Sequence, residues 1–248
     1  DAGNQALTAN NAKHVSAAPP GEGFTLAIAG ADITDSRLVA ALTGNITLHG
    51  DNTITQQMWL QRQGPAAFIL NANTAQATAL LPQVKTTTTL SFGWLAVDSE
   101  FYVDEQLTSV PLLGNKAPFS VTTRAQSELY SQLTLEIALD APASQATQLH
   151  YQTQNGTALA NEDYLATSGS VVFEVGQRSK LITVPLLSDP INANANNEGD
   201  EYFKVLLSGS AHNFTGTVHG YGVIYNNSAQ DANAPTIANS TVAQNSLM

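Results

Sequence analysis

The chain has 248 residues, enough for one large domain or two small ones, each with a substantial core. Only 12% of the residues are charged, about half of the usual share of roughly 25%. The 20 Asp and Glu outnumber the 9 Lys and Arg and give a net charge of −11. A chain this acidic has no electrostatic footprint for nucleic acid or anionic lipid. Its hydrophobic content of 43% is that of a folded protein and argues against disorder.

The chain contains no cysteine, which excludes disulfides, thiolate nucleophiles and zinc–thiolate sites. No apolar run reaches the roughly 18 residues of a transmembrane helix, so we predict no membrane insertion. The first residue is Asp1, which fits either a mature form without its signal peptide or a cut fragment. A neutral surface rich in Thr, Asn and Ser is typical of secreted proteins. We therefore predict an extracellular or cell-surface location.

The N-terminal residues 1–23 are predicted to form an extended arm. Small and polar residues lead there into Pro19-Pro20, which forbids continuous helix and favours polyproline-like chain. A domain boundary is predicted near residue 116, where Gly114, Asn115 and Pro118 cluster between two strand-rich regions. These signals divide the chain into the arm, a β-rich domain over residues 24–116, a second domain over 117–228, and a polar tail or linker over 229–248.

Strand patterns dominate both predicted domains. In the first, residues 24–28 alternate with period two, and residues 86–95 are rich in β-branched and aromatic side chains. Only residues 35–42 and 74–81 are candidates for short helices. In the second, seven short strands separated by turns are typical of an antiparallel sandwich; they are expected at 119–123, 133–139, 148–153, 170–173, 180–187, 202–207 and 217–225. The predicted fold class is all-β, with two sandwich domains in tandem.

Residues 149–225 also carry a distinctive order of motifs. They begin with Asn155-Gly156, expected as a tight turn, and Asp163-Tyr164. A strand with Ser168-Gly169, a strand over 182–187 and the segment 199–208 follow. This order closely resembles the Calx-beta domain, a seven-stranded immunoglobulin-like sandwich common in bacterial surface proteins and adhesins. The resemblance covers residues 119–227, and the first half of the chain resembles no family.

The resemblance implies a calcium site. In calcium-binding members of the family, carboxylates at one end of the sandwich bind Ca²⁺, which takes about 6–8 oxygen ligands. The positions that match these ligands are Asp163, Asp189, Glu198, Asp200 and Glu201.

The chain departs from the family pattern at Ser188, Asn226 and Asn227, which stand where the family commonly has acidic residues. Each change removes a charge, and ligand charge helps to set calcium affinity. Two interpretations therefore remain: a weak calcium site, or a metal-free sandwich whose acidic loop is solvated.

A second acidic cluster, formed by Asp98, Glu100, Asp104 and Glu105, lies in the first half of the chain. Alternation along a strand would place Glu100 and Asp104 on one face. A calcium or interdomain site and a solvated strand face are the two interpretations. Aromatic residues nearby offer either a sugar-binding platform or buried core; they are Trp59, Trp94, Phe101 and Tyr102.

No catalytic motif is evident. The five histidines form no metal-binding spacing, and neither a nucleophile elbow nor a phosphate-binding loop occurs. We therefore predict a non-enzymatic structural or adhesive surface protein. One version is a filament subunit whose N-terminal residues 13–18 add as a strand to a neighbouring copy. The alternative is a calcium-responsive or carbohydrate-binding module of a larger secreted protein, with cell-surface glycans as partners.

Overall fold

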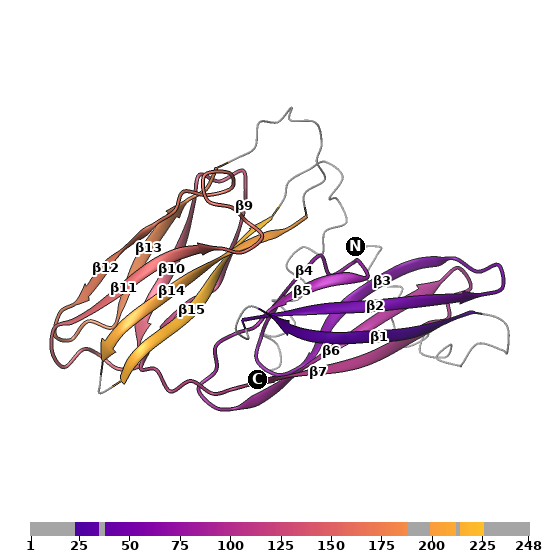
Figure 1. Ribbon diagram of the computed structural model, residues 1–248, viewed down its shortest axis with the longest axis horizontal. Helices are drawn as coiled ribbons and strands as arrows, with labels where there is room; N and C mark the ends of the chain where they lie inside the picture. Colours follow the sequence, from indigo (N-terminus) through magenta and orange to yellow (C-terminus); the bar gives the residue numbers. More distant parts are fainter. Residues whose placement is uncertain (1–22, 35–37, 188–198, 212–213, 226–248) are drawn as a thin grey trace. The chain divides into compact units, whose positions relative to one another are not determined.

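The computed structural model describes residues 23–34, 38–187, 199–211 and 214–225. All secondary structure in this part of the chain consists of β-strands, numbered β1 to β15, which confirms the all-β prediction (Figure 1). No helix long and apolar enough to cross a membrane is present among the described residues. The predicted N-terminal arm and C-terminal tail lie outside them, apart from Gly23.

The chain forms two compact units. Unit 1 contains the described residues up to Pro82 and returns at Thr88–Leu112. Unit 2 contains Gln83–Thr87 and the described residues from Leu113 onward. The short segment Gln83–Thr87 is anchored within unit 2, since Val84 bridges to Gly114 and its carbonyl accepts a hydrogen bond from the Asn115 amide at 2.7 Å. The chain therefore passes between the two units at more than one place.

Unit 1 consists of two open sheets. One has the order β1 (Gly23–Thr34), β2 (Val39–His49), β5 (Gln76–Leu80) and β4 (Phe68–Leu70). The other has the order β3 (Ile54–Gln63), β6 (Thr88–Asp98) and β7 (Val103–Leu112). The sheets pack face to face, because Gly44 of β2 lies so close to the Trp94 indole of β6 that a Cβ atom there would be 2.6 Å from the ring. Only a residue without a side chain fits at this position.

The two predicted short helices are wrong. Strand β2 occupies the end of the first candidate segment, and β5 occupies most of the second. These Ala-rich stretches pair with each other in the sheet, from Val39 opposite Leu80 to Thr43 opposite Gln76. Both Ala40 and Ala79 are fully buried. Packing between neighbouring strands thus overrides the helix propensity of alanine.

Unit 2 is a sandwich of a three-stranded and a five-stranded sheet. The first has the order β13 (Ser179–Pro185), β10 (Gln132–Leu139) and β8 (Phe119–Val121). The second has the order β12 (Ser168–Phe173), β11 (Thr147–Asn155), β14 (Glu201–Ala211), β15 (Phe214–Tyr225) and β9 (Arg124–Ser127). The sequence did not predict β9, which is short, polar and parallel to β15.

The core of unit 2 follows the predicted alternation. Inward positions of both sheets are buried, among them Leu135, Ile137, Val184, Phe203 and Leu207. Each such side chain contributes roughly 1.5–3 kcal/mol when it leaves water. Because these residues come from strands distant in sequence, the core fixes the sheets and thereby the loops between them.

Candidate functional sites

Several connections of unit 2 leave the same end of the sandwich. Pairing of Asn155 with Phe203 places the end of β11 beside the start of β14. Pairing of Glu201 with Ile224 places the end of β15 there as well. The predicted calcium ligands Asp163, Asp200 and Glu201 belong to this end, which we call the loop end of unit 2.

The loop that carries Asp163 is held by hydrogen bonds and one buried aromatic ring. The Asn155 Oδ1 atom accepts hydrogen bonds from the Tyr164 hydroxyl at 2.7 Å and from the Ala160 amide at 3.1 Å. Tyr164 is buried and stacks on Phe203 with ring centroids 4.4 Å apart. Burial raises the pKa of Tyr164, the hydrogen bond with Thr153 opposes this rise, and the negative charge of Asp163 adds to it. The loop is therefore anchored in the core.

The connection between β11 and β12 is longer than the tight turn predicted at Asn155-Gly156. Asn155 ends β11, and the chain returns to strand only at Ser168. A Cβ atom at Gly156 would lie 2.4 Å from the Tyr202 backbone carbonyl oxygen. Glycine is needed here for close approach between two backbones, and the expected tight turn is instead the start of a longer connection.

The described carboxylates at the loop end serve separate local roles. The Asp163 Oδ2 atom accepts a hydrogen bond from the Leu159 amide at 2.6 Å. Asp200 lies near Tyr225, whose pKa is raised first by burial and then by the Asp200 charge. Glu201 is the first residue of β14. The other two predicted ligands, Asp189 and Glu198, lie outside the described residues, as do Ser188, Asn226 and Asn227.

These carboxylates do not by themselves fit a calcium ion. Calcium takes about 6–8 oxygen ligands, and one Asp163 oxygen already accepts a backbone hydrogen bond. Within the described residues, no three Asp, Glu or His side chains lie together in a group that could hold a metal. The structure thus brings Asp163, Asp200 and Glu201 to one end of unit 2 but does not gather them into a cluster.

The acidic cluster of unit 1 does not lie on one strand face, as alternation had suggested. The chain turns between Asp98, which ends β6, and Val103, which begins β7. The fully buried Asp98 carboxylate holds this turn, because Oδ1 accepts hydrogen bonds from the Glu100 amide at 2.9 Å and the Tyr102 amide at 2.8 Å. Asp98 therefore has a structural role in the hairpin.

Of the two interpretations of the aromatic residues, buried core holds for both tryptophans. Trp59 and Trp94 are fully buried and lie 5.1 Å apart, centroid to centroid, on the paired strands β3 and β6. Phe101 is 71% exposed at the β6–β7 turn, where its φ of 66° lies in the left-handed region. Two of the aromatic residues are therefore in the core and one is exposed in a turn, so they form no common surface.

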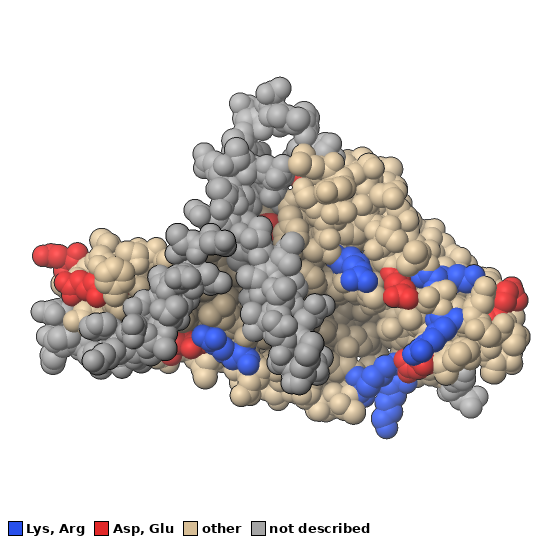
Figure 2. Space-filling view, turned by 180° about the vertical axis from the view of Figure 1, so that it is seen from behind, with Lys and Arg blue, Asp and Glu red and all other residues tan. Residues whose placement is uncertain are grey.

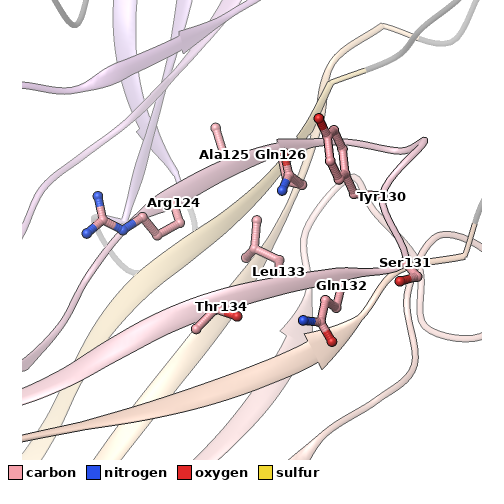
Figure 3. Close-up of a pocket in the computed structure, with 8 residues that line it drawn as sticks. All are labelled: Arg124, Ala125, Gln126, Tyr130, Ser131, Gln132, Leu133 and Thr134. Carbon is pink, nitrogen blue, oxygen red and sulfur yellow. The ribbon is translucent and has the colours of Figure 1, made fainter.

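A groove that the sequence did not predict lies in unit 2 between β9 and β10. It has a volume of about 450 Å³ and is lined by residues 124–126 and 130–134 (Figure 3). Figure 3 shows Leu133 between the two strands, Arg124 toward one end and Tyr130 at the other. Leu133 is 2% exposed and Tyr130 is 59% exposed. Only the unexpected strand β9 creates this groove.

The surface carries few charges. Figure 2 shows blue and red side chains interspersed on the visible face, with tan residues between them. Two ion pairs occur among the described residues, Arg62 with Glu105 at 2.5 Å and Lys85 with Asp140 at 2.9 Å. Both are partly exposed, so each contributes about 0–1 kcal/mol.

The described part of unit 2 is an immunoglobulin-like sandwich, and comparison with known families defines it further. Residues 115–220 match the family model described as the Calx-beta domain, which confirms the predicted resemblance. The first half of the chain has no family match. No curated protein matches the chain.

Solved structures resemble the chain at low sequence identity. The apo-form Calx CBD1 domain shares 18% identity, with 45% of this chain and 100% of that chain covered and a TM-score of 0.39. The calcium binding domain CBD12 of CALX1.1 shares 19%, with 44% and 45% covered and a TM-score of 0.38. The MSCRAMM ACE of Enterococcus faecalis shares 6%, with 82% and 94% covered and a TM-score of 0.27. None of these similarities identifies what the chain binds.

Proposed function

We propose that this chain is a non-enzymatic structural or adhesive protein of the cell surface that assembles through its sheet edges. The observation that carries this proposal is that, within the described residues, all four sheets are open. Each sheet there ends on both sides in a strand with one described partner, for example β9 and β12 in the largest sheet. An open edge presents backbone N–H and C=O groups to a strand from another molecule. The Calx-beta match and the low surface charge support the proposal.

The strand that we propose as donor is formed by residues 13–18, which lie outside the described residues. Main-chain hydrogen bonds give affinity when an extended segment adds to a sheet edge. Repetition of this contact from one copy to the next joins chains head to tail and produces an open filament. A cell-surface location agrees with such a role and is part of the proposal.

The size of the native particles tests this function. Purified full-length chain is expected to form multimers in light scattering and filaments in negative-stain microscopy. Deletion of residues 1–22 should leave monomers, and replacement of residues 13–18 by a Gly/Ser segment of equal length should do the same. Deletion of residues 229–248 is the matched control and should not prevent assembly. Only monomers of the full-length chain, indistinguishable from the deletion variant, would refute assembly.

Calcium binding is the second candidate function, favoured because the chain brings Asp163, Asp200 and Glu201 to one end of a Calx-beta domain. We propose a weak site that is completed by Asp189 and Glu198, both outside the described residues. Glycans of a cell surface are the alternative partner, and a glycan array with the full-length chain tests them.

A further inference from the structure

The groove between β9 and β10 is a seam where the sandwich is open. After β8 the chain leaves the three-stranded sheet and continues as β9 in the other sheet. Strand β10 pairs with β8 only over residues 137–139, whereas it pairs with β13 over residues 132–138. Among the described strands, the first half of β10 and β9 therefore each have one partner, and they face each other across the groove (Figure 3).

Backbone groups of both strands point into this seam. The amide of Thr122 donates to the Glu136 carbonyl, and the Glu136 amide donates to the Thr122 hydroxyl, both at 2.9 Å. Backbone direction alternates along a strand, so Thr134 directs its N–H and C=O to the same side as Glu136. On β9, the Glu128 amide donates to the Tyr225 carbonyl at 3.2 Å, which places the Ala125 backbone groups on the open side. An added strand would find donors and acceptors there.

The side chains that line the seam combine one buried apolar residue, Leu133, with mostly polar neighbours. Leu133 forms an apolar floor and the exposed Tyr130 ring forms one rim. Gln126 pairs with Ile224, whose side chain lies in the core, so Gln126 also points toward the interior of the sandwich. The residues that line the groove include a cation, Arg124, but no Asp or Glu.

We propose that residues 13–18 of a second copy occupy this seam and pair antiparallel to β9; this inference rests on the proposed function. In an antiparallel arrangement with Lys13 opposite Glu128, Val15 lies opposite Gln126 and Ala17 opposite Arg124. Val15 and Ala17 then face the Leu133 floor, and Lys13 lies near a carboxylate. Pro19-Pro20 follows and ends the pairing, because proline has no amide hydrogen.

The short link between the donor segment and β1 limits this contact. Ala18 lies five residues before Gly23, and a fully extended link of that length spans about 17 Å. The start of β1 in one copy must therefore lie within about 17 Å of the seam of the next copy. In this register the four residues of β9 lie opposite His14, Val15, Ser16 and Ala17.

Engineered disulfides in the full-length chain test the seam directly, because the chain contains no native cysteine. The proposed pairing sets Ser16 opposite Ala125, within the Cα separation of about 4.4–6.8 Å that a disulfide tolerates. The variant Ser16→Cys/Ala125→Cys should form a ladder of covalent multimers under mild oxidation. The matched control is Ser16→Cys/Ser168→Cys, which places the second cysteine on β12, the other edge of the same sheet, and should give no ladder.

The other outcomes separate the two proposals. A ladder only in the β12 control overturns the seam while assembly stands, and cross-linked monomers alone would show that the segment occupies its own chain's seam. Multimers that never cross-link at Ala125 also overturn the seam, whereas the absence of multimers of any kind refutes the proposed function itself. As a second variant, Ala125→Pro removes one seam-facing N–H on an edge strand that tolerates proline. We expect about tenfold weaker assembly with an unchanged melting temperature of the monomer, and unchanged assembly would contradict the seam.

Discussion

Replacement of Asn155 by alanine tests how the loop end of unit 2 is held. Asn155 Oδ1 accepts two hydrogen bonds, from the buried Tyr164 hydroxyl and from the Ala160 amide. A buried donor left without its acceptor costs about 1–3 kcal/mol. Tyr164 retains its interaction with Thr153, so we expect a loss of about 2 kcal/mol. For a domain of this size, each kcal/mol lowers the melting temperature by about 4–8 °C.

The two units can be followed separately in this experiment. Both tryptophans, Trp59 and Trp94, lie in unit 1. Tryptophan fluorescence therefore reports unfolding of unit 1, whereas calorimetry reports both units. The calorimetric transition without a counterpart in tryptophan fluorescence belongs to unit 2. Asn155→Ala should lower the melting temperature of this transition.

A double-mutant cycle with Tyr164→Phe isolates the hydrogen bond between the two side chains. The phenylalanine variant retains stacking on Phe203 but has no hydroxyl, so Asn155→Ala should cost about 1 kcal/mol less in this background. An equal cost in both backgrounds would refute the role assigned to this hydrogen bond. A shift confined to tryptophan fluorescence would refute the assignment of Asn155 to the stability of unit 2.

Three further predictions concern pH, packing and calcium. The pKa values of Tyr164 and Tyr225 are raised in the folded state, so their contribution to stability is complete below the unfolded pKa of about 10 and is lost as the pH rises further. Thermal melts at alkaline pH should therefore show a falling melting temperature of unit 2 above this pH, with a smaller fall in Tyr164→Phe. A melting temperature that does not change with alkaline pH would contradict the assignment. Gly44→Ala should destabilise unit 1 by about 1–3 kcal/mol through its clash with Trp94. The melting temperature of unit 1, followed by tryptophan fluorescence, measures this loss of stability. A melting temperature unchanged within experimental error would exclude tight packing at this position. If calcium binds with a Kd of about 1 mM, replacing chelator by about 10 mM free calcium should stabilise unit 2 by about 1.4 kcal/mol. Asp163→Asn should reduce this stabilisation. An unchanged melting temperature in calorimetry would argue against the site.

Local patterns in the sequence were sufficient for the strand content and for the core of unit 2. Alternation over residues 133–139 correctly predicted that Leu133, Leu135, Ile137 and Leu139 point inward, and all four are buried. This succeeds because side chains alternate along any strand, whatever its partners. The order of motifs around Asp163-Tyr164 was specific enough to identify the Calx-beta domain, which the family comparison confirmed.

Positions that depend on partners far along the chain were not predictable in this way. Ala40 and Ala79 lie in strands because β2 and β5 pair, although alanine favours helix. The pattern of acidic residues near Asp98 suggested a continuous strand, but its buried carboxylate accepts hydrogen bonds from the Glu100 and Tyr102 amides and stabilises a turn. The first case is a pairing distant in sequence that outweighs the local preference, whereas the second is a local hydrogen-bonded turn that the alternation pattern does not reveal.

The sequence by itself determined the all-β class, the resemblance of residues 115–220 to the Calx-beta domain and the low share of charged residues, because composition, strand alternation and motif order are local properties. Only the tertiary structure reveals the seam that we propose as the binding site for a partner. The strand β9 is polar and only four residues long, and it exists because β15 offers it a parallel edge. Its departure from β8 separates it from β10 and opens the seam, so the site that we propose for assembly arises from pairings between distant segments.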